Sequence, residues 1–478
     1  MPLILSGNVA SATADAGYTV ANSCRFNDDD NPKMTVTPSS SGTNAGLKYT
    51  LSAWVKLGNI GADKTIWSCS SDTYIYITGA GIISCNFRRD GGTNYQYEST
   101  RRLRDPSAWY HIVMRVDTTD STDADKVQVY VNNEEDTPSI TSYQNMADDF
   151  ETGGNVSGIE QRIGVYSDGS LDFDGYMAEV IMVDNQSLAP TSFGEYDSDT
   201  PTIWKPKDIS DISVGTNGYY LDFEDSSNLG NNAAGSGSAD LTETNLAAAD
   251  QATDTPTNNF ATMNPLAYRL DGGVSLPTYS EGNCKIVCDD SGGAHKSSMS
   301  TIGVATGKWY WEMKFTVDND SGFCGIARAE YDPNDNFAGR SIYYNSGNGA
   351  LSVGTGTGGT SDGSYGDTYT TGDTVGVAFD ATNGVIWFSI DGVWQNSATI
   401  EEIGAGTTTN AATTGITMGQ TWMPFLEGVD CTWEVNLGGS PAFTVSSGNA
   451  DGDGYGNFEY AVPSGYYALC TKNLAEYG

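Results

Sequence analysis

Apolar and polar side chains alternate along much of this chain with a period of two, and turn residues interrupt the pattern. In residues 307–315 every second side chain is large and apolar. The inward set is Trp309, Trp311, Met313 and Phe315, and the outward set is Tyr310, Glu312 and Lys314. Successive side chains of a strand point to opposite faces, so this segment is predicted to be a strand with one buried face.

Turn signals join such strands into hairpins. Residues 374–380 and 385–390 flank Asn383-Gly384, and Asp391-Gly392 follows directly. Asn-Gly and Asp-Gly adopt the positive φ angles that two-residue hairpin turns need. Because no helical segment separates these hairpins, they predict an antiparallel sandwich.

The first half of the chain carries the same signals. Residues 49–55 and 109–117 read as strands, and residues 126–131 end at a turn, Asn132-Asn133. Residues 173–184 carry apolar side chains at adjacent as well as alternate positions, which predicts a central strand covered on both faces.

Length and composition complete the predicted fold class. A chain of 478 residues needs two or three cores, and its 57 glycines suit many short strands and tight turns. We expect an all-β protein with two antiparallel β-sandwich (jelly-roll-like) domains in series, joined by an irregular connector. The predicted boundaries are 1–204 for the first sandwich, 205–275 for the connector, and 276–478 for the second sandwich with a C-terminal extension.

The connector is predicted from a loss of pattern. Residues 226–257 are rich in Asn, Ala, Gly, Ser, Asp and Thr, and they show no apolar periodicity. A long loop laid over a neighbouring sandwich is the alternative interpretation.

Charge excludes one class of partner. The chain has 61 Asp and Glu against 23 Lys and Arg, a net charge of −38. Nucleic-acid binding depends on cations that neutralise phosphates, so no nucleic-acid partner is expected. The chain contains no run of 18 apolar residues, so membrane insertion is not expected. Its N-terminal sequence lacks the basic segment of a secretory signal. We therefore expect synthesis in a cytoplasm without a signal peptide.

Catalytic residues are scarce. Of the two histidines, His111 falls inside a predicted strand and His295 in a Gly-rich turn, residues 292–296. The nearest approach to a glycosidase Glu-x-Asp-x-x-Glu signature is Glu195-Tyr196-Asp197-Ser198-Asp199-Thr200, in which the third carboxylate is missing. We expect no enzymatic activity, no catalytic residues and no cofactor.

Metal binding has one candidate. Asn449, Asp451 and Asp453 occupy positions 1, 3 and 5 of an EF-hand-like calcium loop, but Tyr460 stands at position 12 where Glu is required. The eight cysteines lack the spacing of a zinc site and are expected to be small buried hydrophobes.

Two stretches of the chain resemble known domain families. The segments 109–111, 127–131 and 173–180 resemble, in this order, recurring strands of the laminin-G/concanavalin A-like lectin superfamily, over roughly residues 20–200. Asn133 departs from the Gly that is usual there. Further on, the segments 307–312, 324–327, 372–380, 386–392 and 435–439 resemble a SPRY domain. SPRY domains are bent sandwiches that bind partners, mostly proteins, through loops at one end.

The SPRY resemblance implies where a ligand would bind. Five aromatic side chains lie among Gly, Ser, Asn and Asp near the expected loop ends, where rings could stack on a ligand: Tyr343, Tyr344, Tyr365, Tyr369 and Trp394. The alternative is that these rings cover a sheet end.

The two domains together resemble a family of marine tailed-bacteriophage virion proteins, many labelled tail fibre proteins. Segments that carry this resemblance are 23–29, 104–111, 191–195, 454–460 and 469–474. It implies a structural protein on the virion surface that recognises a host glycan or protein, contacts other virion proteins and forms a homo-oligomer. The alternatives are a purely architectural capsid-decoration or neck protein and a polysaccharide depolymerase.

Overall fold

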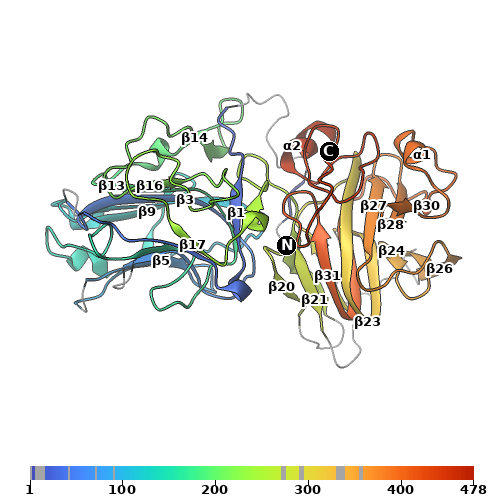
Figure 1. Cartoon of the computed structure of the whole chain (residues 1–478), viewed down its shortest axis with the longest axis horizontal. Helices are drawn as coiled ribbons and strands as arrows, with labels where there is room; N and C mark the ends of the chain where they lie inside the picture. The colour runs from blue at the N-terminus through green and yellow to red at the C-terminus, as the bar shows by residue number, and fades with distance from the viewer. Residues whose placement is uncertain are drawn as a thin grey trace. The chain divides into compact units, whose positions relative to one another are not determined.

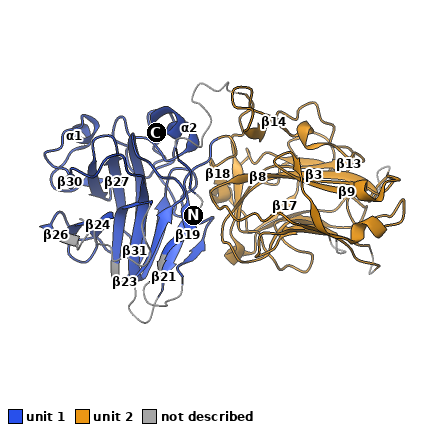
Figure 2. Cartoon of the chain, turned by 180° about the vertical axis from the view of Figure 1, so that it is seen from behind, with its two compact units in different colours: residues 1–12, 258–478 blue, residues 13–257 orange. Residues whose placement is uncertain are grey.

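Strands dominate the chain in the computed structural model (Figure 1). The structure describes residues 3–5, 17–40, 44–69, 73–89, 92–270, 276–289, 295–329, 340–354 and 359–478. Figure 2 shows its two compact units: residues 13–257, here called the first sandwich, and residues 258–478 with 1–12, here called the second sandwich. The predicted all-β fold class is confirmed. No helix in the described ranges has the length and apolar character that crossing a bilayer requires.

The first sandwich contains two antiparallel sheets. One has the order β10-β9-β8-β3-β13-β1-β18, with β16 also on β13. Its strands are β1 (Ser23–Phe26), β3 (Lys48–Leu57), β8 (Trp109–Asp117), β9 (Val127–Val131), β10 (Glu134–Glu135), β13 (Gly175–Asp184), β16 (Tyr219–Leu221) and β18 (Gln251–Ala252).

The other sheet has the order β11-β7-β6-β5-β4-β12-β2-β17. Its strands are β2 (Lys33–Val36), β4 (Lys64–Cys69), β5 (Tyr74–Ile77), β6 (Ile83–Phe87), β7 (Tyr95–Ser99), β11 (Pro138–Thr141), β12 (Gln161–Ile163) and β17 (Thr242–Thr244). A separate pair joins β14 (Gly194–Tyr196) to β15 (Trp204–Pro206). Single 3-10 turns lie at Asp28–Asp30, Asp123–Asp125, Ser142–Asn145, Pro190–Ser192 and Ala248–Asp250.

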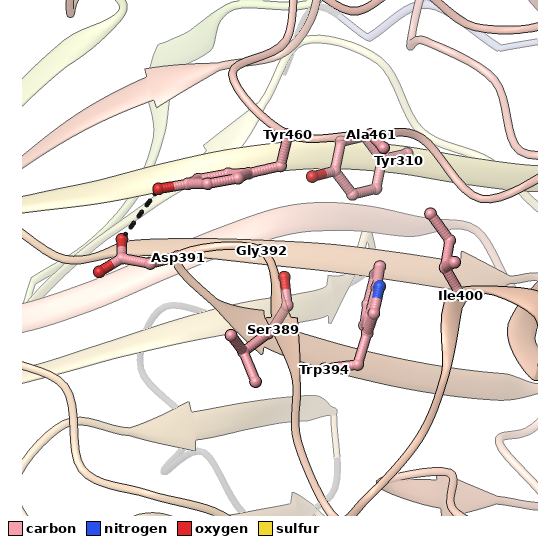
Figure 3. Close-up of a pocket in the computed structure, with 9 residues that line it drawn as sticks. Tyr310, Ser389, Asp391, Gly392, Trp394, Ile400, Tyr460 and Ala461 are labelled. Atoms are coloured by element: carbon pink, nitrogen blue, oxygen red, sulfur yellow. Dashed lines mark hydrogen bonds between the residues drawn. The ribbon is translucent and has the colours of Figure 1, made fainter. Parts of the chain in front are cut away.

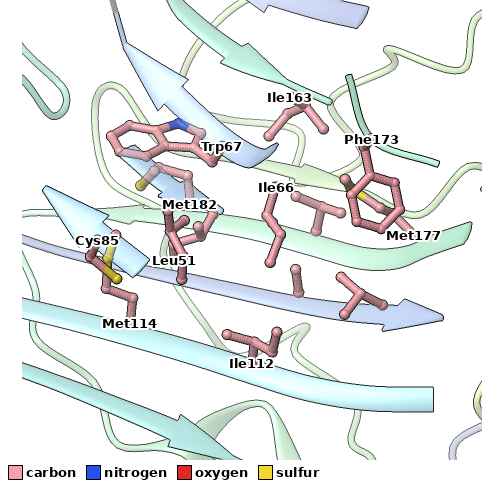
Figure 4. Close-up of a cluster of buried hydrophobic side chains, with 14 of the residues drawn as sticks. Leu51, Ile66, Trp67, Cys85, Ile112, Met114, Ile163, Phe173, Met177 and Met182 are labelled. Carbon is pink, nitrogen blue, oxygen red and sulfur yellow. The ribbon is translucent and has the colours of Figure 1, made fainter. Parts of the chain in front are cut away.

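The core of the first sandwich lies between its two sheets (Figure 4). Leu51 and Met114 of one sheet pack in the same cluster as Ile66, Trp67 and Cys85 of the other. Every residue of β13 is buried, which confirms the predicted central strand. Its outer face is covered by a separate cluster around Trp54, Trp109 and Tyr176.

The second sandwich is built from one connected antiparallel sheet. Its strands are β19 (Met263–Leu270), β20 (Thr278–Ser280), β21 (Lys285–Cys288), β22 (Lys296–Ser300), β23 (Lys308–Arg328), β24 (Ser341–Asn345), β25 (Ala350–Gly354), β26 (Gly359–Ser364), β27 (Thr374–Asp380), β28 (Val385–Ile390), β29 (Val393–Trp394), β30 (Thr413–Thr414) and β31 (Trp422–Asn436). Two short helices are α1 (Ile400–Gly404) and α2 (Thr471–Tyr477).

The long strands β23 and β31 pair along their lengths and connect the parts of this sheet. The first half of β23 also pairs with β27, and its second half pairs with β24. Register shifts between Phe315 and Val317 and between Asp318 and Ser321 mark bulges, and bulges bend a strand. The bend lets one sheet enclose its own core.

The predicted outward face of β23 is not exposed, which corrects the prediction for two of its side chains. Tyr310 and Glu312 are fully buried, whereas Lys314 is partly exposed. The C-terminal extension covers Tyr310 and Glu312. Its residues Phe458, Tyr466 and Ala468 belong to the same buried cluster as Tyr310 and Trp387. Strand alternation assigned these residues to the correct face, but it could not show that a distant segment covers that face.

The predicted connector is divided between the two units. In residues 205–257, β16, β17 and β18 pair with β13, β2 and β1, so this segment belongs to the first sandwich. Residues from 258 onward belong to the second sandwich, together with Ile4, which bridges Ile302. The predicted boundaries at 204 and 276 therefore shift, and residues 271–275 lie outside the described residues.

Short polar side chains explain why the segment 205–257 lacks periodicity. Asn232 Oδ1 accepts from the Tyr220 backbone N–H (3.0 Å), and Asp225 Oδ1 accepts from the Ser227 N–H (2.9 Å). Such contacts satisfy backbone groups without a strand ladder. Occasional apolar residues, such as Leu229 and Leu241, still reach the core.

All eight cysteines are buried and none forms a disulfide, as expected of small buried hydrophobes.

Candidate functional site

The five aromatic side chains predicted to bind a ligand do not form one site, and they differ in burial. Tyr344 and Tyr369 are fully buried, and Tyr369 donates to the carbonyls of Gly322 (3.0 Å) and Tyr344 (2.9 Å). Their rings belong to the core of the second sandwich, so they cannot present a face to a ligand. Tyr344 lies inside β24, so these two rings are core residues rather than covers of a sheet end.

The other three predicted aromatics are partly exposed. Tyr343 packs edge-on against Phe323, with ring centroids 5.0 Å apart. The Tyr365 hydroxyl accepts from the Phe388 backbone N–H (3.3 Å). Trp394 is the member of the predicted set that lines a hollow in the surface (Figure 3).

This hollow is the candidate functional site and has a volume of about 420 Å³. Its lining comes from β23, the β28–β29 hairpin, the start of α1 and the C-terminal extension: Tyr310, Ser389, Asp391, Gly392, Val393, Trp394, Ile400, Tyr460 and Ala461. Sequence reasoning identified Trp394 and the Asp391-Gly392 turn. It gave no binding role to Ser389, Ile400 or Tyr460, because no local pattern joins these segments.

A tight hairpin turn shapes one side of the hollow. Ile390 pairs with Val393, and the two residues between them, Asp391 and Gly392, have φ angles of 47° and 77°. This turn is favoured by Asp-Gly. A Cβ atom on Gly392 would lie 2.6 Å from the ring of Tyr460, so glycine also allows that ring to lie against the turn.

Asp391 and Tyr460 form the polar part of the hollow. The Tyr460 hydroxyl donates to Asp391 Oδ1 (3.2 Å) (Figure 3). The same oxygen accepts from the Thr374 backbone N–H (3.0 Å). Burial is the main cause that raises the pKa of Tyr460 to about 12, and the Asp391 carboxylate raises it further. The phenol therefore stays protonated at neutral pH and acts as a donor.

Glu312 connects two segments that line the hollow, β23 and the C-terminal extension. Its Oε1 accepts from the Tyr310 hydroxyl (3.0 Å) and the Tyr460 backbone N–H (2.8 Å). Its Oε2 accepts from Asn436 Nδ2 (3.2 Å) and the Glu459 backbone N–H (2.9 Å). Burial raises the pKa of Glu312 to about 7. Glu312 thus fixes the C-terminal extension on β23.

A second hollow, of about 470 Å³, has a different electrostatic character. It lies where the chain leaves α1, at Ala405 and Gly406, and is lined by Lys308 and Asp380. Lys308 Nζ lies 3.7 Å from Asp380 Oδ2, so the two charges balance. The first hollow has Asp391 in its lining and no basic side chain.

The candidate calcium loop is organised by protein donors. Asp451 Oδ1 accepts from the backbone N–H groups of Asp453 and Tyr455, both at 2.9 Å. Its Oδ2 accepts from the Ala468 N–H (2.9 Å) and Asn473 Nδ2 (2.8 Å). Within the described residues, no group of three or more His, Cys, Asp or Glu side chains is arranged to hold a metal ion. Both carboxylate oxygens of Asp451 thus serve the fold.

Substituting Asp451 tests this structural role. We expect Asp451→Asn to lower the free energy of unfolding by about 1–3 kcal/mol, because the amide nitrogen faces two buried donors. Thermal unfolding should show this loss equally with and without millimolar calcium. Asp453→Asn, the matched control in an exposed position, should change little. Calcium-dependent stabilisation of the wild-type chain that both variants lose would establish a metal site instead.

His111 is buried and cannot serve as a base. Its ring stacks on Trp54, with ring centroids 4.7 Å apart. Trp204 Nε1 donates to its Nδ1 (2.9 Å), and Ser52 Oγ lies 2.8 Å from its Nε2. Burial lowers the pKa of His111 to about 3, so it stays neutral.

The two other candidates for chemistry are His295 and the acidic segment 195–200, and both make contacts that hold the fold. His295 lies 2.9 Å from Glu427, with its ring beside Phe323, and the rest of its predicted turn, residues 292–294, lies outside the described residues. In the acidic segment, Asp197 accepts from the Thr200 N–H (2.8 Å), the main cause that lowers its pKa, and from Lys205 Nζ (3.1 Å). Asp197 therefore closes a turn before β15.

A comparison with family profiles found a match within the first sandwich. Residues 28–189 match the family profile Laminin_G_3, described as the concanavalin A-like lectin/glucanases superfamily. This part of the chain is thus a concanavalin A-like jelly roll. A search of curated proteins found no match.

Solved structures resemble parts of the chain at low similarity. The SPRY domain of human HERC1 is 14% identical, over 36% of this chain and 96% of that chain, with a TM-score of 0.28. A candidate carbohydrate-binding protein from Bacteroides ovatus is 17% identical, over 48% and 61%, with a TM-score of 0.32. A heptameric SAP-like pentraxin from Limulus polyphemus is 14% identical, over 36% and 80%, with a TM-score of 0.27. At these values we draw no functional conclusion from them.

Proposed function

We propose that this chain is a non-catalytic binding protein on the surface of a tailed-bacteriophage virion, where it recognises a glycan or protein of the host. The observation that carries the binding role is the hollow beside Trp394. It combines partly exposed aromatic rings with a carboxylate on the rigid β28–β29 hairpin. Rings and a few fixed polar groups are typical of ligand sites.

The location on a virion rests on the family resemblance of the sequence. The concanavalin A-like sandwich supports a binding role, and the neutral, buried His111 supports the absence of catalysis. The chain would be made in the host cytoplasm, assemble with other virion proteins as a homo-oligomer, and require no cofactor. Mass spectrometry of purified particles tests this proposal, and particles that lack the protein would refute it.

A pair of variants tests the hollow as the recognition site. We expect Trp394→Ala to reduce binding of the purified protein to host cells about tenfold or more, because aromatic anchors dominate binding sites. Met418→Ala, which truncates an exposed side chain outside the hollow's lining, should bind as the wild type does. Flow cytometry of labelled protein measures both. Equal binding by the two variants would show that the recognition site lies elsewhere. Release of sugars from host glycans by the protein would indicate a depolymerase instead.

A further inference from the structure

The hollow beside Trp394 contains an anionic group that the protein leaves partly unused. Oδ1 of the exposed Asp391 accepts two hydrogen bonds, from Thr374 and Tyr460. Among the described residues, no donor contacts its Oδ2. The Oγ atom of Ser389, which also lines the hollow, is buried and has no hydrogen-bond partner in the described part of the chain. Both residues line the hollow.

The rest of the lining is mainly apolar. Trp394 and the ring of Tyr460 face the hollow, and Val393, Ile400 and Ala461 complete it (Figure 3). Val393 is 67% exposed, which is unusual for a branched apolar side chain in a strand. These groups can cover an alkyl chain, and the aromatic rings can also attract a cation.

The charged side chain in the lining of the hollow, Asp391, is negative. No Lys or Arg belongs to its lining, unlike the second hollow with Lys308. Glu401 and Glu402 follow Ile400 at the start of α1, and both are exposed or partly exposed. The whole chain carries a net charge of −38. A cation is therefore the complementary ligand.

We propose that this hollow binds a basic side chain, Lys or Arg, of a protein partner. The alkyl stem lies along Val393, Trp394 and Ile400, and the cationic head contacts Asp391 Oδ2. A cationic head fits Asp391 better than a neutral sugar does, because attraction between opposite charges adds to the hydrogen bond. This inference rests on the proposed binding function and selects a protein over a glycan as the ligand.

The test uses blocked tripeptides as probes for the full-length protein. Gly-Arg-Gly carries the cation, and Gly-citrulline-Gly is its neutral near-isostere. The readout is the chemical shift of the Trp394 indole N–H, which Trp394→Phe assigns by its disappearance. We expect the arginine peptide to shift this signal in a salt-sensitive manner, with the citrulline peptide at least about tenfold weaker.

Asp391→Asn provides the matched variant. The amide oxygen can keep the bonds from Thr374 and Tyr460, while an NH₂ group replaces the free oxygen. We expect this variant to lose the arginine response by about tenfold or more, and Asp367→Asn, the same charge change at an exposed position outside the lining, to retain it.

The outcomes separate this inference from the proposed function. Equal shifts by the arginine and citrulline peptides, or an unchanged response in Asp391→Asn, would overturn the cationic ligand but leave the hollow a binding site. A shift caused by a neutral oligosaccharide and by neither peptide would assign the hollow to a glycan. No shift by any probe, with wild-type host-cell binding by Trp394→Ala, would remove the hollow from the binding function altogether.

Discussion

Replacing Glu312 with glutamine should lower the free energy of unfolding of the second sandwich by about 3 kcal/mol or more. Four donors converge on the two carboxylate oxygens: the Tyr310 hydroxyl, Asn436 Nδ2, and the backbone N–H groups of Glu459 and Tyr460. A glutamine NH₂ group would face two of these donors, and a buried donor without a partner is costly. Urea unfolding followed by circular dichroism measures the loss.

The control for this variant is Glu476→Gln, at an exposed position of α2. It should change the free energy of unfolding by less than about 0.5 kcal/mol. If Glu312→Gln were as mild as this control, the hydrogen-bonded anchor of the C-terminal extension would be refuted.

The same variant should also change how stability depends on pH. The pKa of Glu312 is about 7 in the folded protein, raised by burial above its ordinary value of 4.5. A raised pKa means that the folded state binds this proton more tightly than the unfolded state. The resulting stabilisation is complete below about pH 4.5 and is lost as the pH rises through about 7, a change of about 3 kcal/mol.

Other carboxylates contribute to the pH dependence of the wild-type chain, including Glu179 and Asp174 of the first sandwich, whose pKa values burial also raises to about 7. The difference between wild type and Glu312→Gln isolates Glu312. We expect the wild type to lose more stability than the variant between pH 5 and pH 8. Parallel pH profiles would contradict the assignment.

The second large effect concerns a buried ion pair in the first sandwich. Lys56 Nζ lies 2.5 Å from Asp254 Oδ2, and both side chains are 1% exposed. Asp254 also accepts from Trp109 Nε1 (3.1 Å). We expect Lys56→Met to lower the free energy of unfolding of this sandwich by about 3–5 kcal/mol, because it leaves a buried carboxylate without its counter-charge.

Calorimetry of two further variants completes this test. Lys207→Met, at an exposed lysine, should have little effect. In the double variant Lys56→Met/Asp254→Leu, neither charge of the pair remains, so part of the lost stability should return, although Trp109 Nε1 loses its acceptor. A double variant less stable than Lys56→Met would mean that the ion pair is not the source of the effect.

Local sequence patterns predicted the hairpins well, because a hairpin depends on neighbouring residues. The predicted strands 374–380 and 385–390 coincide with β27 and β28. At Asn132-Asn133, both residues adopt positive φ, 50° and 66°, as the turn before β10 requires. The Asp391-Gly392 turn is correct for the same reason.

The candidate site was predicted only in part. Trp394 lies in the hollow, whereas Tyr344 and Tyr369 are core residues, although all three stand among small polar residues in the sequence. Tyr344 lies inside β24 and Trp394 in β29, so the neighbouring residues showed neither the strand nor whether the ring folds inward. That depends on space between strands that are distant in sequence.

The sequence by itself determined the all-β class, the alternation of strand faces and most hairpin turns, because each follows from the conformational preferences of neighbouring residues. The tertiary structure decided which faces are covered. Residues 205–257 complete the first sandwich, and the C-terminal extension buries Tyr310 and Glu312 and contributes Tyr460 to the hollow. These contacts join segments that are distant in the sequence: Ser23 pairs with Ala252, and Glu312 and Tyr460 are 148 residues apart. These long-range contacts form because they bury apolar surface and pair buried polar groups. No local pattern in the sequence indicates which distant segments will do so.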